Sequence, residues 1–363
     1  MARKPEGPLR RGWTTGACAT AATKAAYTAL LTGGFPDPVS IRLPKGEEPA
    51  FALAREALGD GWASAGIVKD AGDDPDVTHG ATVIATVRLG PAGSGVTFRA
   101  GEGVGTVTLA GLPVPPGQPA INPVPRRMMT EVVAEVAAAH GGAADDVEIE
   151  ISIPGGAELA EKTWNPRLGI VGGLSILGTT GVVVPFSCAA WIHSIHRGID
   201  VARAAGLQRV AGCTGSTSEA AVAKRHALPE IAWLDMGDFA GGLLKYLRAH
   251  PLPNLTLAGG FAKFTKLAQG HLDLHSGRSQ VDMDWLAGQL AALGADAGLV
   301  AAARNANTAA EVLGLARAAR VPIATRVADL AHATAVAALR GAPVAVEVLV
   351  VDRDGDVAGE AHG

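Results

Sequence analysis

Cysteine is scarce in this chain. The three cysteines, Cys18, Cys188 and Cys213, are an odd number in 363 residues, and none of them stands in a C-x-x-C spacing. Disulfide-based folds need paired cysteines, and structural zinc sites usually need closely spaced thiols, so the count argues against both. We therefore expect a reducing compartment and a cytoplasmic location.

Long apolar runs and an excess of positive charge are also missing. No stretch of about 18 uninterrupted apolar residues occurs, as a membrane-spanning helix would require. The formal net charge of −4 argues against a globally basic nucleic-acid-binding protein, but it leaves room for a local basic pocket that takes an acidic small molecule. We expect neither a membrane nor nucleic acid among the partners.

Several catalytic motifs are absent. The sequence has no Gly-x-Ser-x-Gly elbow and no Walker-type lysine loop, so serine hydrolases and P-loop kinases have little support. It also lacks a clean Gly-x-Gly-x-x-Gly, which makes a nicotinamide fingerprint a poor match.

Glycine, in contrast, is concentrated in residues 165–181, which we call the glycine-rich segment. It carries five glycines and three hydroxyl side chains between short apolar runs. Such density suits a chain that turns sharply or approaches a ligand closely, and we expect two short buried strands with a glycine-lined floor between them. Gly172, Gly173, Thr179 and Thr180 are candidate substrate contacts. A close packing corner between domains is the alternative.

The length predicts two domains, and the pattern of elements changes near residue 160. Residues 1–160 mix an alanine-rich helix with short strands, which predicts an α+β domain. Residues 161–363 alternate strands with helices, which predicts a Rossmann-like α/β domain with a mostly parallel sheet and helices on both faces.

Within the second part, residues 209–235 form a strand, a glycine-containing turn, a helix and a second strand. Glycines let the backbone approach a ligand, amides at a helix start offer donors, and an acid that ends the next strand can accept both ribose hydroxyls. This unit predicts a site for an adenosine-containing cofactor, formed by Gly212, Thr214, Gly215, Ser216 and Asp235. The alternative is a tight turn with Asp235 as an ordinary cap.

Cations recur beside glycine or proline turns. Arg126, Lys263, Lys266 and Arg278 are candidate substrate-binding residues, because each can give a charge-assisted hydrogen bond to a polycarboxylate ligand. Taken singly, each fits a solvated surface residue as well.

Histidines offer one candidate catalytic group. His275 lies in a turn rich in glycine and serine, where it could contact substrate or accept a proton. We expect no metal, because a third ligand is missing from the two pairs with helical spacing, His193 with His196 and His271 with His275.

Five separated blocks now suggest a family. The chain resembles the cobalt-precorrin-5B C1-methyltransferases of cobalamin biosynthesis in residues 14–19, 102–105, 119–126, 163–181 and 266–276. The resemblance spans most of the chain, residues 14–282, and adds little after that.

This resemblance implies that S-adenosylmethionine donates a methyl group to ring carbon C1 of a corrinoid precursor, a tetrapyrrole fringed with acid arms. The family's catalytic residues are not assigned by pattern. Two rivals stay open from the residues alone: a dinucleotide-dependent oxidoreductase, and a non-catalytic tetrapyrrole-binding protein. The sequence also leaves a homo-oligomer open.

Overall fold

The computed structural model describes residues 7–141 and 146–363. The chain divides into two compact units, Met1–Cys188 and Ala189–Gly363, called here the N-terminal and C-terminal units. The sequence places the division after residue 160 instead. Residues beyond 160 stay with the N-terminal unit because two strand pairs hold them there: β1 (Gly12–Trp13) with β11 (Val182–Val183), and β8 (Thr106–Val107) with β10 (Ile170–Val171).

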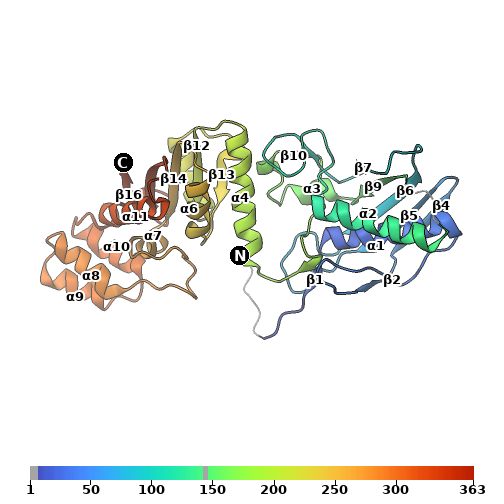
Figure 1. The fold of residues 1–363 in the computed structure, drawn as a ribbon. Helices are drawn as coiled ribbons and strands as arrows, with labels where there is room; N and C mark the ends of the chain where they lie inside the picture. Colours follow the sequence, from blue (N-terminus) through green and yellow to red (C-terminus); the bar gives the residue numbers. More distant parts are fainter. Residues whose placement is uncertain (1–6, 142–145) are drawn as a thin grey trace. The chain divides into compact units, whose positions relative to one another are not determined.

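The main sheet of the N-terminal unit has five strands (Figure 1). Their order is β4-β5-β6-β9-β7, and the pairing is antiparallel except between β7 and β9. The strands span Arg55–Gly59, Trp62–Val68, Thr82–Leu89, Val147–Ser152 and Val96–Ala100 in that order. Smaller elements of the unit are β2 (Val39–Ser40), β3 (Ala50–Phe51), α3 (Gly156–Ala160) and the 3-10 turn η1 (Pro166–Leu168).

Two helices pack on one face of this sheet: α1 (Thr15–Thr32) and α2 (Pro123–Ala139). Thr14 caps α1 by accepting from the Ala17 amide, and seven of its alanines are fully buried, so the helix is enclosed on nearly all sides. Helix α2 begins at Pro123, which occupies the first helical position, where no amide is needed.

The C-terminal unit contains the second five-stranded sheet, in the order β13-β12-β14-β15-β16. The first four strands are parallel, and only β16 is antiparallel. They span Trp233–Asp235, Arg209–Cys213, Asn254–Gly260, Ala345–Val351 and Val357–His362. The predicted α/β class is therefore confirmed, and four of five strands are parallel. The sequence did not predict β16.

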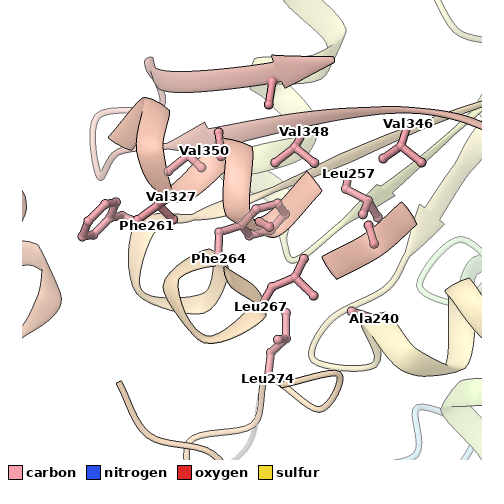
Figure 2. Close-up of a cluster of buried hydrophobic side chains, with 14 of the residues drawn as sticks. Ala240, Leu257, Phe261, Phe264, Leu267, Leu274, Val327, Val346, Val348 and Val350 are labelled. Carbon is pink, nitrogen blue, oxygen red and sulfur yellow. The ribbon is translucent and has the colours of Figure 1, made fainter. Parts of the chain in front are cut away.

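Helices cover both faces of this sheet. Helix α5 (Ser216–Arg225) packs on one face, and the other carries α4 (Cys188–Ala204), α6 (Ala240–Ala249), α7 (Phe261–Ala268) and α11 (Ile323–Leu339). Three valines at alternate positions of β15, Val346, Val348 and Val350, lie toward Phe264 and Leu267 of α7 (Figure 2). The remaining helices are α8 (Met283–Ala292), α9 (Ala297–Arg304) and α10 (Ala309–Ala318), and a 3-10 turn, η2 (Glu230–Ala232), precedes β13.

The helices were compared with the length and hydropathy of a membrane-spanning segment. Among the described residues, none of the helices is both long and apolar enough to cross a membrane.

Candidate cofactor and substrate site

The strand order reverses between β12 and β14. From β12 the chain continues to β13 on one side, whereas from β14 it continues to β15 on the other side. In open α/β sheets, ligands bind beyond the carboxyl ends of the strands at such a reversal. Cys213, the last residue of β12, lies level with Asp235 and Ala258, so the predicted cofactor residues gather at this edge of the sheet.

Gly212 has a packing role. It is buried within β12, and a Cβ there would lie 2.7 Å from Leu243 Cδ1 in the core. Close packing therefore accounts for this glycine without a ligand.

The turn after β12 is held by one hydroxyl group. Ser218 Oγ accepts hydrogen bonds from the amides of Thr214 and Gly215, at 3.1 and 3.2 Å, and donates to the Gly215 carbonyl at 2.7 Å. The Thr214 amide also donates to the Ala258 carbonyl at 3.0 Å. These two amides are therefore occupied by protein acceptors, although the sequence suggested the whole turn as a donor set.

The next two amides have a different environment. Ser216 and Thr217 are exposed and form the first turn of α5, where backbone N–H groups have no acceptor within the helix. A Cβ on Gly215 would meet nothing within 4 Å. The part of the turn that can face a ligand is therefore Gly215, Ser216 and Thr217.

Asp235 ends β13 beside this turn and is half-buried. Its backbone carbonyl accepts from Trp191 Nε1 of α4 at 2.8 Å, which fixes the strand end. An acid here, next to the β12 turn, has the placement that recognition of a ribose requires.

Lys263 and Lys266 lie one turn apart on α7, and both are engaged with protein groups. Lys263 Nζ lies 3.0 Å from Asp238 Oδ1 and donates to the Thr214 carbonyl at 3.3 Å. Lys266 is 5% exposed, and its ammonium donates to the carbonyls of Leu274 and Ser279. Burial lowers the pKa of Lys266. Lys266 therefore ties the loop after α7 to the helix.

That loop, residues 269–282, carries His275 and Arg278, both exposed. His275 Nδ1 accepts from the Gly277 amide at 3.1 Å, so the hydrogen of a neutral ring lies on Nε2, which can then donate. Arg278 pairs with Asp273 and lies 5.9 Å above the ring centre of Phe239. The side chains of His275 and Arg278 are therefore accessible to solvent on this loop.

The remaining predicted cation, Arg126, belongs to the N-terminal unit. Its Nε donates to the Ile121 carbonyl at 2.8 Å and its Nη2 to the Pro119 carbonyl at 3.1 Å, and the guanidinium lies 5.3 Å above the Phe98 ring. Burial lowers the pKa of Arg126. Its recorded partners in the described part of the chain are carbonyls and a ring, with no carboxylate among them.

In the glycine-rich segment, the four predicted contacts differ. Gly173 is buried, and a Cβ there would lie 2.2 Å from the Gly103 carbonyl oxygen. Gly172 is exposed with φ +86°, and Thr179 is exposed as well. The Thr180 hydroxyl bonds with the backbone of Val182. Gly173 is thus a packing position, while Gly172 and Thr179 face outward. The two predicted short strands are present as β10 and β11, but the expectation that both are buried is wrong, because Val171 is 61% exposed and both residues of β11 are only half-buried.

This segment also joins three of the other blocks that carry the resemblance. Leu174 exchanges backbone hydrogen bonds with the block at 102–105, through Gly103 and Gly105, each at 2.9 Å. Ile176 does the same with the block at 119–126, donating to Ala120 at 2.8 Å and accepting from Asn122 at 2.9 Å.

The third contact is with the start of α1. The Leu177 carbonyl accepts from the Gly16 amide at 2.9 Å, and the Leu177 amide donates to Thr15 Oγ at 3.0 Å. Four blocks that are far apart in the sequence therefore form one hydrogen-bonded region of the N-terminal unit.

Two side chains that matter here were missed from the sequence. Ser218 holds the turn, and Asp238 is a buried acid paired with Lys263. Ser218 is the third residue of α5 after the N-cap Gly215, the position from which a capping-box side chain reaches back to the N-cap amide. Nothing in the local sequence distinguishes Asp238 from a surface acid.

Among residues 7–141 and 146–363, no group of three or more histidine, cysteine or acidic side chains could hold a metal ion. Of the two histidine pairs, His193 and His196 have ring centres 6.1 Å apart, and His196 stacks on Tyr246 at 3.9 Å.

Fold and site together define the class: an α/β protein whose candidate ligand site lies at the carboxyl edge of parallel strands, where their order reverses. Two family models match the sequence, one described as CbiD over residues 2–185 and one described as CbiD, C-terminal domain, over residues 273–362. The chain belongs to the CbiD family, which confirms the resemblance drawn from the five blocks.

Curated relatives match almost the whole chain. Proteins named cobalt-precorrin-5B C(1)-methyltransferase from Paramagnetospirillum magneticum and Brucella anthropi are each 67% identical, over 98% and 96% of this chain and 99% and 95% of their own lengths. One of the same name from Brucella abortus (strain S19) is 65% identical over 98% of this chain and 96% of its own length. None of these three is named as an oxidoreductase or a carrier.

One solved structure is also similar. It is the cobalamin biosynthesis protein (cbiD) from Archaeoglobus fulgidus, 28% identical, which matches over 70% of this chain and 78% of its own, with a TM-score of 0.40.

Proposed function

We propose that this chain is a methyltransferase that methylates C1 of cobalt-precorrin-5B, or of its metal-free analogue, to give the corresponding precorrin-6A. The observation that carries the proposal is the 67% identity to proteins of that name over 98% of the chain. Identity at that level over both units supports a shared reaction rather than a shared fold alone.

The methyl donor in this proposal is S-adenosylmethionine, and the C-terminal unit acts as a Rossmann-like domain that binds it. Gly215, Ser216 and Asp235 would hold the adenosine part, with Thr214 and Gly212 shaping the turn. The fit is supported by the open space where a Gly215 side chain would stand and by the exposed first turn of α5. When bound, the donor supplies a methyl group already activated by its sulfonium.

The substrate is a tetrapyrrole with acetate and propionate arms. Their carboxylates would bind to cationic side chains of the protein. Arg126 suits such an arm, because within residues 7–141 and 146–363 its half-buried guanidinium contacts two carbonyls and a ring but no carboxylate. Arg278, the exposed cation of the C-terminal unit, is proposed for an arm as well, in exchange for its contact with Asp273. Gly172, Thr179 and Thr180 would contact the macrocycle. Lys266 and Gly173 were also predicted as substrate contacts. In this proposal Lys266 instead holds the loop at residues 269–282, and Gly173 allows close packing against Gly103.

The protein's own task is then alignment and exclusion of water. Orienting two reactants can contribute roughly 7–11 kcal/mol to lowering a barrier in favourable cases. No dedicated nucleophile is required. His275, the predicted catalytic residue, would donate from Nε2 to the substrate; to accept a proton at Nε2 it would have to give up the hydrogen bond from the Gly277 amide to Nδ1. A cytoplasmic location and a homo-oligomer stay predictions.

The direct test is a methyl-transfer assay with cobalt-precorrin-5B and S-adenosylmethionine whose methyl group carries a heavy carbon isotope. The proposal expects the label at C1 of the product and release of S-adenosylhomocysteine. Label at another ring carbon, or none, would overturn it. Running the metal-free analogue in parallel decides which substrate form is preferred.

A further inference from the structure

Lys263 joins two of the loops at the carboxyl edge of the parallel strands. It lies on α7, directly after β14, and its ammonium reaches the loops that follow β12 and β13. Nζ lies 3.0 Å from Asp238 Oδ1, in the loop after β13, and donates to the Thr214 carbonyl in the turn after β12 at 3.3 Å. One charged group therefore connects the ends of β12, β13 and β14.

Asp238 depends on that charge. The residue is 8% exposed, and its buried Oδ1 accepts no hydrogen bond within the described part of the chain, so the contact with Lys263 is ionic. A buried carboxylate without a compensating charge is unfavourable. Removal of Lys263 would therefore leave the Asp238 carboxylate uncompensated and destabilise its position. The backbone carbonyl of Asp238 also accepts from the Leu274 amide at 2.8 Å, which ties in the loop that carries Arg278.

The Thr214 carbonyl has a defined place in the site. It belongs to the turn whose amides Ser218 holds, and the exposed amides of α5 follow directly. A shift of this carbonyl would therefore move Gly215 and Ser216, the groups that the proposed function assigns to the methyl donor.

We propose that Lys263, together with Asp238, is a positioning residue for the methyl-donor turn rather than a docking cation for the acid arms of the substrate. The inference rests on the proposed function, since it takes the β12 turn as the donor site. It differs from the expectation drawn from the sequence, in which Lys263 contacts substrate directly.

The experiment measures two affinities on the full-length chain. The Kd of S-adenosylhomocysteine is measured by calorimetry and the KM of cobalt-precorrin-5B by methyl transfer, for Lys263→Met, Asp238→Asn and the double variant. Each single change is expected to raise the Kd by about tenfold and leave the KM unchanged, and the double variant is expected to be no worse than either single one. Lys263→Arg should restore part of the affinity.

Lys245→Met is the matched control, because Lys245 is an exposed lysine on α6. A raised KM with an unchanged Kd in Lys263→Met would make Lys263 a docking cation and overturn the inference. Unchanged values for both would also overturn it while leaving the proposed function intact. Absence of S-adenosylhomocysteine binding to the unmodified protein would instead remove the donor site, and the inference with it. Should Lys263→Met not fold, Asp238→Asn, which keeps the side-chain shape, decides the question.

Discussion

Glycine serves two different purposes in this chain, as a comparison of Gly173 in the N-terminal unit with Gly215 in the C-terminal unit shows. In the N-terminal unit, Cβ atoms added at Gly103 and Gly173 would lie 1.9 and 2.2 Å from the carbonyl oxygens of Ile153 and Gly103, so the backbone segments touch one another. In the C-terminal unit, Cβ atoms at Gly215 and Gly260 would meet nothing within 4 Å. A high density of glycine therefore has two physical meanings, and what the missing side chain would meet tells them apart.

Gly173→Ala is expected to have the largest effect of the changes that test this comparison of packed and open glycines. The new methyl group would overlap the Gly103 backbone, which cannot move without disturbing β10 and its neighbours, so we expect a loss of about 3 kcal/mol in the free energy of unfolding. Chemical denaturation measures it. Gly34→Ala is the control, since Gly34 is exposed and has open space around it. Equal stability of the two variants would show that the segment is not packed as described.

Asn165→Ala probes the same packing through a side chain. Asn165 is 7% exposed, donates from Nδ2 to the Gly173 carbonyl at 3.0 Å and accepts from Ser175 Oγ at 3.1 Å. Its removal leaves two buried groups without partners, which is expected to lower the free energy of unfolding by about 2 kcal/mol. The exposed Asn307, changed to alanine, should have almost no effect in the same denaturation series. Comparable losses in the two variants would argue against a special role for Asn165.

Gly215→Ala tests the other half of the comparison. The backbone at Gly215 is extended and its surroundings are open, so the protein should keep its stability. The added methyl group would occupy space assigned to the methyl donor, and we expect the Kd of S-adenosylhomocysteine to rise by about tenfold, or roughly 1.4 kcal/mol. Titration calorimetry together with thermal unfolding separates the two effects. Lower stability with unchanged affinity would place Gly215 in the packing class instead.

The smallest expected effect concerns pH and a buried acid of the C-terminal unit. Burial works to raise the pKa of Glu347, but hydrogen bonds from Thr256 and His226 and the charge of Arg225 outweigh it, so the pKa lies below its ordinary value. A lowered pKa in the folded state stabilises the protein above the pKa of the unfolded chain, about 4.3, and this stabilisation is lost as the pH falls through the folded value.

Glu347→Gln should therefore flatten the dependence of stability on pH below about 4.3, measured by thermal unfolding across a pH series. The exposed Glu56 of β4, changed to glutamine, is the control and should leave the slope as it is. A slope that is the same in both variants would mean that Glu347 does not contribute to the acid sensitivity.

Patterns with a clear period predicted most elements. The alanine-rich helix α1 was expected from its composition. The alternation of strands and helices predicted for residues 161–363 is present from β12 onward, because burial on one side of an element leaves a repeat in the sequence. Helix α7 was missed, since Gly259-Gly260 suggested a turn and its two lysines suggested surface loops. The helix instead buries Phe261, Phe264 and Leu267 while it positions both lysines.

The candidate site was predictable to a lesser extent. The β12 turn and Asp235 followed from a local rule, the glycine turn at the start of a helix and the acid that ends the next strand. The roles of Lys266 and Asp238 depend on contacts with loops distant in sequence, which no local pattern contains. Gly173 looked like a ligand contact because the sequence does not show which carbonyl lies against it.

Gly259 has a mechanical consequence for the donor turn. A Cβ at this position would lie 2.2 Å from the Phe264 ring and 2.7 Å from the Thr214 methyl group, so strand end, turn and interior aromatic are in direct contact there. Stiff, close-packed interiors transmit displacement instead of absorbing it. These contacts hold the turn in one conformation. A ligand that binds to this preformed surface therefore costs the protein little conformational entropy.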